Sequence, residues 1–225
     1  MRIRWYISLI VVGLICEASI FAQSSATTSS PAADARNVVV LGDSLAAGYG
    51  LDPSDAFPAL LQKKINDAGW KFHVVNAGVS GDTSAGGLRR LDWLLKRRVD
   101  VLVIELGGND GLRGLSPAAL KKNLQSIIER TRQKYPAAQV VLAGMKMPAN
   151  LGSYATEFER TYSDVAKEND VPLVPFLLEG VGGNPDLNLP DRIHPTADGQ
   201  KILAENVWTV LKPVLAKMAR PDAGT

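Results

Sequence analysis

Residues 38–50, with the sequence VVVLGDSLAAGYG, decide the fold of this chain. Three valines and a leucine lead directly into Gly42, Asp43 and Ser44. A continuous apolar run that ends at a glycine predicts a strand buried on both faces, followed by a tight turn. In an open α/β sheet, ligands bind beyond the carboxyl ends of the strands. The turn would therefore present the Ser44 hydroxyl at the edge where such sites form.

The rest of the chain alternates predicted strands with predicted helices. Four further strands are predicted, over residues 72–76, 101–104, 140–143 and 171–176. Alternating strands and helices predict parallel βαβ units. We therefore expect the α/β class, as a three-layer αβα sandwich around a five-stranded parallel sheet of the flavodoxin-like kind. Two prolines in the last strand place it at an edge, and Pro213 predicts a kink or a break in the final helix.

The N-terminal segment has the composition of an export signal. Residues 1–22 combine Arg2 and Arg4, an apolar run and Ala22 as a cleavage residue. The apolar run is shorter than the roughly 20 residues that span a bilayer, so cleavage is favoured over an uncleaved anchor. We expect a periplasmic or secreted protein without a stable membrane span. The predicted organisation is a signal peptide (1–22), a flexible Ser/Thr-rich segment (23–36), one domain (37–218) and a short tail (219–225).

Composition excludes several classes of protein. The 225 residues suffice for one domain with a sizeable core. A net charge of +2 without long runs of like charge gives no reason to expect a nucleic-acid partner. The single cysteine, Cys16, lies in the predicted signal peptide, so the mature domain would have no disulfide, catalytic thiol or thiolate metal site. Lipid attachment at Cys16 is the alternative, which the bulky Ile15 before it disfavours.

His194 is the histidine that can act as a base. It lies three residues after Asp191 in a proline-rich segment, whereas His73 falls inside a predicted strand. Pro195 keeps His194 out of the helical conformation, and a tight turn would let the Asp191 carboxylate reach Nδ1. Nε2 would then face Ser44, which needs a base to become a nucleophile. An isolated D-x-x-H more often forms only a local Asx turn, but its combination with Ser44 favours a catalytic arrangement.

Attack of a serine on an acyl carbonyl also needs donors for the developing oxyanion. Three candidates follow three different predicted strands: the backbone N–H of Ser44, the backbone N–H of Gly81 and the side-chain amide of Asn109. Each is an ordinary turn residue when taken alone. Their joint occurrence at three strand ends favours an oxyanion hole.

Four segments together resemble the sequence blocks of the GDSL, or SGNH, hydrolase family. They are GDSL at 42–45, NAGVSGDTS at 76–84, ELGGND at 105–110 and DRIHP at 191–195. The resemblance extends over residues 37–217 and is strongest to the bacterial thioesterase, lysophospholipase and arylesterase branch. It implies Ser44 as nucleophile, His194 as base, Asp191 as acid, and Gly81 and Asn109 in the oxyanion hole. One departure is Arg192, which stands where that family often has glycine.

The resemblance implies a hydrolase of small carboxylic esters or thioesters that works through an acyl-enzyme. We expect a monomer without a cofactor, and without a metal because the sequence has no cluster of His, Cys or carboxylate ligands. The loop at 145–155 would form an apolar wall over the acyl group, with Met145, Met147, Pro148 and Leu151 as substrate-binding residues. A carbohydrate deacetylase with the same catalytic residues is an alternative. A non-catalytic doubly wound binding module would explain the fold, but not the joint presence of Ser44, Asn109, Asp191 and His194.

Other charged residues near these motifs are predicted to be structural. Asp43 and Asp110 would each fix their own turn through backbone hydrogen bonds. Glu105 could pair with an arginine. A solvated helix face is predicted for four arginines: Arg89, Arg90, Arg97 and Arg98.

Overall fold

A computed structural model describes residues 35–219 of the chain. Residues 1–34 and 220–225 lie outside the described residues. These two ranges contain the predicted signal peptide with Cys16, nearly all of the predicted Ser/Thr-rich segment and the end of the predicted tail.

A parallel five-stranded sheet forms the centre of the described domain. Its strands run in the order β2-β1-β3-β4-β5, and every neighbouring pair is parallel. The strands are β1 (Arg36–Gly42), β2 (Phe72–Gly78), β3 (Val101–Glu105), β4 (Gln139–Ala143) and β5 (Leu173–Val174). This confirms the predicted α/β class, and the two-residue β5 lies at an edge as its prolines predicted. Because Pro172 and Pro175 flank β5, the pairing is shorter than the predicted 171–176.

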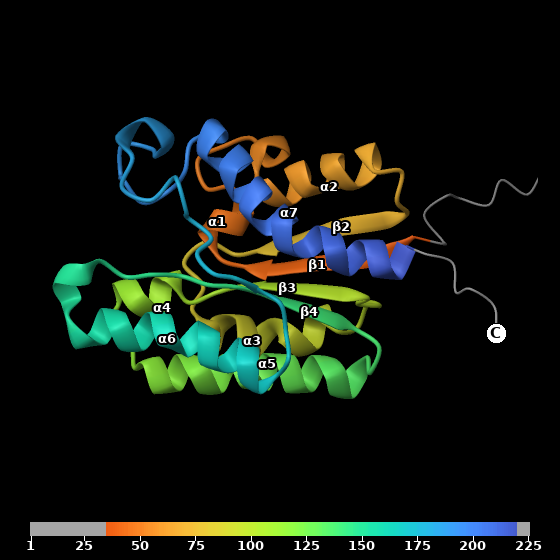
Figure 1. Cartoon of the computed structure of the whole chain (residues 1–225), viewed down its shortest axis with the longest axis horizontal. Coiled ribbons are helices and arrows are strands. Elements are labelled where there is room, and N and C mark those ends of the chain that lie inside the picture. Colours follow the sequence, from red (N-terminus) through yellow and green to blue (C-terminus); the bar gives the residue numbers. More distant parts are fainter. Residues whose placement is uncertain (1–34, 220–225) are drawn as a thin grey trace, which may run out of the picture. The chain divides into compact units, whose positions relative to one another are not determined.

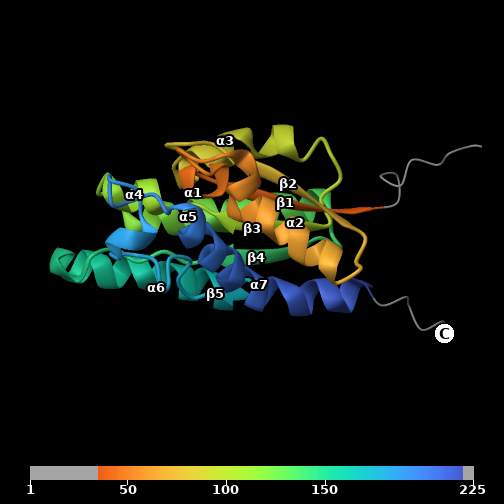
Figure 2. The ribbon, with the colours of Figure 1, turned by 90° about the horizontal axis from the view of Figure 1, so that it is seen from above.

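Helices cover both faces of this sheet (Figure 1). Helices α2 and α7 lie on one face, while α3, α5 and α6 lie on the other, and the view from above agrees (Figure 2). The helices are α1 (Ser44–Ala47), α2 (Phe57–Asp67), α3 (Ser84–Leu94), α4 (Gly108–Leu112), α5 (Pro117–Lys134), α6 (Ser153–Glu168) and α7 (Ala197–Ala219). Single turns of 3-10 helix lie at η1 (Pro53–Asp55), η2 (Ala149–Leu151) and η3 (Pro185–Leu187). The predicted three-layer sandwich is therefore confirmed.

The central strands are buried on both faces, as their apolar runs predict. All five residues of β3 are buried, and so are Val38 to Gly42 in β1. Burying one such valine or leucine side chain contributes about 1.5–3 kcal/mol. Helices pack against the sheet through apolar stripes that include Leu61 of α2 and Leu124 of α5, both fully buried.

Two local features concern helices α7 and α2. Helix α7 continues as one helix through Pro213, so the break considered for this position does not occur. Helix α2 has no capping side chain at its N-terminus. Instead, the Oε1 atom of the buried Gln200 accepts a hydrogen bond of 2.8 Å from the Phe57 N–H. Because Gln200 also donates to the Leu45 carbonyl at 3.1 Å, this residue of α7 joins α1 to α2.

The carboxyl ends of the strands meet at one edge of the sheet, which lies at the left in Figure 1. Helix α1 follows β1 at this edge and α4 follows soon after β3. Segments 79–83 and 144–152 leave β2 and β4 there. A parallel sheet thus places residues from four distant stretches of the chain beside one another.

Candidate active site

The Ser44 turn begins where β1 ends. Gly42 has no room for a side chain, since a Cβ there would lie 2.5 Å from the Ala46 Cβ and 2.5 Å from Glu105 Oε2. The Asp43 carboxylate accepts a hydrogen bond of 3.0 Å from the Leu45 N–H and thereby caps α1. Gly48 then ends this single helical turn in the left-handed conformation, with φ of 73°. The predicted role of Asp43 in fixing the turn is visible in these contacts, and the turn holds Ser44 at the first position of α1.

The Ser44 hydroxyl meets the ring of His194. His194 Nε2 lies 2.9 Å from Ser44 Oγ, although the two residues are 150 positions apart in the chain. The other ring nitrogen, Nδ1, lies 2.7 Å from Asp191 Oδ2. The ring of Tyr49 packs against the imidazole at a tilt of 34°, with ring centroids 4.3 Å apart. A hydroxyl in this arrangement can pass its proton to Nε2 while the carboxylate holds the imidazole in one tautomer.

Asp191 is fixed by the turn that it belongs to. Its Oδ1 accepts hydrogen bonds from the backbone N–H groups of Ile193, at 2.9 Å, and His194, at 3.0 Å. The His194 backbone N–H, its side chain and the Ile193 N–H together lower the pKa of Asp191 from 3.8 to about 2. The carboxylate is therefore ionised throughout the neutral and mildly acidic range. This charge can stabilise the imidazolium that forms when His194 takes up a proton during a reaction.

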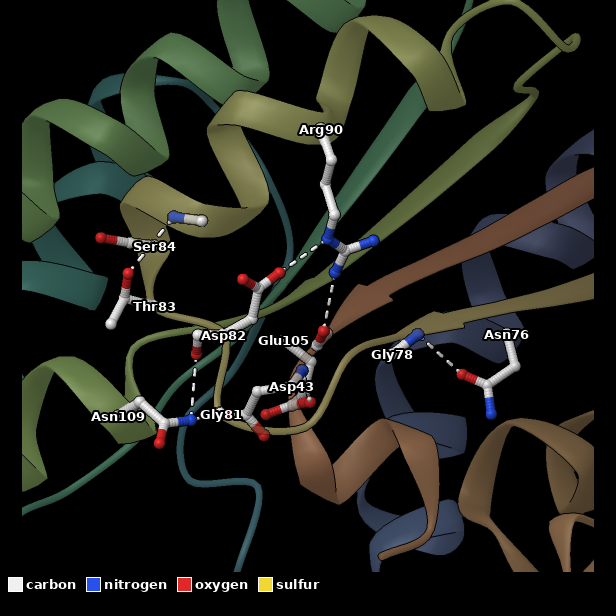
Figure 3. Close-up of polar contacts among 12 residues, drawn as sticks. Asp43, Asn76, Gly78, Gly81, Asp82, Thr83, Ser84, Arg90, Glu105 and Asn109 are labelled. Atoms are coloured by element: carbon white, nitrogen blue, oxygen red, sulfur yellow. Dashed lines mark hydrogen bonds and ion pairs between the residues drawn. The ribbon is translucent and has the colours of Figure 1, made fainter.

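The three predicted oxyanion donors lie on different segments around Ser44. Gly81 has φ of 80°, a conformation that glycine adopts without strain, and Arg113 donates to its carbonyl at 2.9 Å. The Asn109 amide donates to the Asp82 carbonyl at 2.9 Å and, more weakly, to Asp43 Oδ2 at 3.2 Å. One amide nitrogen thus ties the 79–83 segment to the Ser44 turn. Figure 3 shows the contact with Asp82.

Arg90 supplies a second connection between the same two segments. Its Nε lies 2.6 Å from Asp82 Oδ2, and its NH2 group donates to the Gly42 carbonyl at 2.9 Å. Only 22% of the Arg90 side chain and 14% of the Asp82 side chain are exposed. The predicted solvated position of Arg90 is therefore wrong. Gly86 lies one turn before Arg90 on α3. A Cβ at this position would collide with Asp82 Oδ1, so the glycine leaves room for the Asp82 carboxylate.

Two carboxyl groups are buried behind the Ser44 turn. Glu105 is fully buried, and its Oε2 accepts hydrogen bonds from the Asp43 N–H at 3.0 Å and the Ala46 N–H at 3.3 Å. It has no arginine partner among the described residues, so the suggested ion pair is wrong. Burial, followed by the nearby Asp43 charge, raises the pKa of Glu105 well above its ordinary value. Burial also raises the pKa of Asp43 from 3.8 to about 6, against the opposing effects of the Leu45 N–H and the Asn109 amide.

Asp110 acts on a neighbouring element rather than on its own turn. Its carboxylate accepts hydrogen bonds from the Ser84 N–H at 2.7 Å and from Ser84 Oγ at 2.5 Å. Asn123 of α5 also donates to Ser84 Oγ. Asp110 therefore fixes the start of α3, where the prediction had placed its hydrogen bonds within the turn beside Asn109.

An open cleft of about 660 Å³ leads to Ser44 and His194. One part of its wall is apolar and is formed by Met145, Met147, Pro148, Phe176 and Leu178. Three of the four predicted substrate-binding residues are among them. Leu151 is half exposed in η2 and does not line this cleft. The charged residues of the lining are Asp43, Lys146 and Arg192, apart from His194.

Several residues of this site could not be identified from the sequence alone. Tyr49 is one of many aromatic residues in the chain, and only the fold brings its ring to His194. Glu105 had a usable indication, because a carboxyl group that ends a fully apolar strand must be buried. The Gly86-Gly87 pair in a predicted helix indicated a close approach near Arg89 and Arg90, but not which of the two arginines makes it. His73 lies exposed on the edge strand β2, away from the cleft lining.

Two further observations concern the described part of the chain. None of its helices combines the length and the apolar character needed to cross a membrane. Within residues 35–219, no three side chains of the His, Cys, Asp or Glu type gather as metal ligands would.

Comparison with known proteins gives consistent matches. The model of the GDSL-like lipase/acylhydrolase family matches residues 40–202. The chain is 49% identical over 185 residues to the esterase TesA of Pseudomonas aeruginosa, covering 81% of this chain and 91% of that protein. It is 43% identical over 186 residues to thioesterase 1/protease 1/lysophospholipase L1 of Escherichia coli, covering 82% and 87%. The crystal structure of TesA matches with a TM-score of 0.76 and covers 80% of this chain and 99% of that one.

Proposed function

The chain belongs to the GDSL-like lipase/acylhydrolase family and is a serine ester hydrolase, and we propose that Ser44, His194 and Asp191 form its catalytic triad. The observation that carries the proposal is the continuous hydrogen-bonded chain from Ser44 Oγ through the imidazole to Asp191, with distances of 2.9 Å and 2.7 Å. Nucleophile, base and orienting acid are thus within reach of one another.

The first half of the reaction forms an acyl-enzyme. Ser44 Oγ attacks the carbonyl carbon of the ester, and its proton passes to His194 Nε2. The resulting imidazolium is stabilised by the ionised Asp191 carboxylate. When the tetrahedral intermediate collapses, the bond to the alcohol or thiol breaks and the leaving group takes the proton from Nε2.

The second half regenerates the enzyme. A water molecule gives one proton to Nε2 and attacks the acyl carbon. The proton then returns to Ser44 Oγ as the carboxylic acid leaves. Both tetrahedral intermediates carry a negative oxygen, for which we propose the Ser44 N–H, the Gly81 N–H and the Asn109 amide as donors. Asn109 would give up its weaker contact with Asp43, at 3.2 Å, to donate to this oxygen.

Acyl esters and thioesters of small alcohols and thiols are the proposed substrates, with aryl esters and lysophospholipids among them. The apolar wall formed by Met145, Met147 and Phe176 supports this class, since an acyl chain can be buried against it. The same wall speaks against a carbohydrate deacetylase, whose acyl group is short and whose substrate surface is polar. The names esterase and thioesterase/lysophospholipase of the two relatives are in agreement.

Export and a monomeric state are part of the proposal. The charge and apolar pattern of residues 1–22 supports transfer to the periplasm or to the medium. N-terminal sequencing of protein recovered from a periplasmic fraction tests this, because a cleaved chain would begin after Ala22 or shortly beyond. Sedimentation of the purified mature protein tests the monomer.

Replacement of the nucleophile tests the catalytic assignment. We expect Ser44→Ala to lower kcat for short and medium p-nitrophenyl esters by about 10⁴-fold or more. We expect a fluorophosphonate probe to label Ser44 covalently in the parent protein, as located by mass spectrometry. Circular dichroism controls for folding. Labelling at Ser80 or Ser84, which also follow β2, or retention of half the activity in Ser44→Ala would contradict the assignment.

A further inference from the structure

Arg192 has a strained backbone at the edge of the active-site cleft. Its φ is 60°, in the left-handed region that favours glycine. The conformation follows from a tight turn, in which the Arg192 N–H donates to the Leu189 carbonyl at 2.8 Å and the Leu189 N–H donates to the His194 carbonyl at 2.7 Å. Glycine would satisfy this turn without strain. Strained residues that persist at an active site are candidates for a functional role.

The Arg192 side chain is available for a ligand. It is exposed, it lines the cleft beside Ile193 and His194, and no ion pair or hydrogen bond of its guanidinium is found within residues 35–219. The other cation of the lining, Lys146, already pairs with Glu159 at 3.1 Å and lies 5.4 Å from the Phe176 ring centroid. Asp43, the only carboxyl group of the lining, is buried and hydrogen-bonded. Among its lining residues the cleft therefore offers one unengaged cation and no exposed carboxylate. The neighbouring Asp191 carboxylate is already held by the Ile193 and His194 N–H groups and by His194 Nδ1.

The position of Arg192 indicates which part of the substrate it meets. His194 must give its proton to the leaving group, so the leaving group passes beside the turn that carries both residues. Two positions separate Arg192 from His194, which places its Cα within about 7 Å of the His194 Cα. An anion that is close to the ester oxygen on the leaving-group side would thus come within reach of the guanidinium. Arginine suits phosphate in particular, because its planar group can donate two parallel hydrogen bonds.

We propose that Arg192 binds the phosphate of substrates whose leaving group is a glycerophosphate, as in a lysophospholipid. In these esters only the glycerol carbons separate the phosphate from the ester oxygen. The phosphates of a coenzyme A thioester lie at the far end of the pantetheine arm, beyond the reach of Arg192. The inference rests on the proposed esterase function and assigns a preference within it.

A pair of matched substrates tests this assignment. The measured quantity is the ratio of kcat/KM for 1-octanoylglycerol 3-phosphate to kcat/KM for 1-octanoylglycerol, each below its micelle-forming concentration. We expect Arg192→Gly to lower this ratio about tenfold, the effect of losing one charge-assisted contact, and Arg192→Lys to lower it less. The glycine variant should fold, since it adopts the observed φ without strain. Arg97→Gln, a loss of charge on the exposed connection before β3, should leave the ratio unchanged.

The possible results separate the phosphate site from the esterase function. An unchanged ratio in Arg192→Gly, or an equal fall in Arg97→Gln, would overturn the phosphate site alone. A second ratio, for octanoyl-coenzyme A against octanoyl-N-acetylcysteamine, should not respond to Arg192→Gly. If the coenzyme A ratio fell while the ratio for the two glycerol esters stayed constant, Arg192 would bind a phosphate of coenzyme A, and the assignment to a glycerophosphate would be wrong. Cleavage of p-nitrophenyl octanoate without cleavage of either glycerol ester would also overturn the inference, whereas failure to cleave any of these esters would instead refute the proposed function.

Discussion

Asp191 shows how one side chain both builds a turn and serves the proposed catalysis. One oxygen accepts two backbone N–H groups and the other meets His194 Nδ1. These hydrogen bonds hold its pKa at about 2, below the ordinary 3.8. The folded state therefore favours the ionised form, so the stabilising contribution is fully present above about pH 4. It is lost as the pH falls towards 2.

Replacing Asp191 with asparagine tests this double role. In Asp191→Asn an amide oxygen can still accept the two backbone N–H groups, so we expect the turn to persist. The amide nitrogen, however, would favour the imidazole tautomer that carries hydrogen on Nε2, which cannot accept a proton from Ser44. We expect kcat for p-nitrophenyl esters to fall by roughly 10²–10⁴. The thermal midpoint should fall only by the small contribution of one solvent-exposed carboxylate. The matched control is Asp198→Asn, an exposed carboxylate paired with Lys201. Equal activity in the two variants would remove Asp191 from the mechanism.

Among the secondary-structure elements, α3 holds the 79–83 segment against the end of β1. Arg90 reaches from the helix to both the Asp82 carboxylate and the Gly42 carbonyl (Figure 3). Gly81, immediately before Asp82, is a proposed oxyanion donor. Through Arg90, the position of α3 therefore affects the distance between the Gly81 N–H, the proposed donor, and Ser44, the proposed nucleophile.

Loss of the Arg90 contacts should affect the transition state more than substrate binding. We expect Arg90→Gln to lower kcat by roughly 10–100-fold, part of the effect of losing an oxyanion donor, while KM changes less. Arg90→Lys should restore little, because an ammonium cannot reproduce the two divergent N–H groups. The neighbouring Arg89 is exposed, so Arg89→Gln provides a charge-matched control. A change confined to KM would mean that Arg90 does not position the donor.

The same helix shows where prediction from the sequence stops. The apolar runs of β1 and β3 predicted the two strands, and the turn residues after them brought Ser44 and Asn109 into the candidate site. The spacing of Asp191, His194 and Pro195 brought in His194. Arg89 and Arg90 could not be distinguished. Successive residues on a helix point in directions that differ by about 100°, so only the rotation of α3 against the sheet decides which arginine is engaged. Likewise, Gln200 meets Phe57 across 143 positions, a pairing that no local pattern encodes.

For the domain as a whole, the buried carboxyl groups make stability depend on pH. The pKa values of Glu105 and Asp43 are raised by burial, so the folded state holds protons that the unfolded chain has already released. The contribution of Glu105 and Asp43 to the free energy of unfolding is therefore greatest at low pH. It declines as the pH rises from the ordinary carboxyl range near 4 through about 6.

Glu105→Gln should remove part of this dependence. The glutamine oxygen can still accept the Asp43 and Ala46 N–H groups, but it does not titrate. We expect the unfolding free energy of the variant, relative to the parent protein, to increase with pH above about 4.5, by at most about 1.4 kcal/mol per pH unit. Urea denaturation at several pH values measures this difference. Glu157→Gln, on the exposed side of α6, is the control. A constant offset between Glu105→Gln and the parent protein would show that Glu105 does not titrate on unfolding.

The 150 positions between Ser44 and His194 also govern when the chain can act. During synthesis the proposed nucleophile, Ser44, leaves the ribosome early, and the proposed base, His194, leaves it only after all five strands have been made. A nascent chain that ends before residue 191 can already contain β1 and the Ser44 turn, yet its serine has nothing to take up the hydroxyl proton. Under the proposed triad, ester hydrolysis can begin only after the turn that carries Asp191 and His194 has docked beside Ser44.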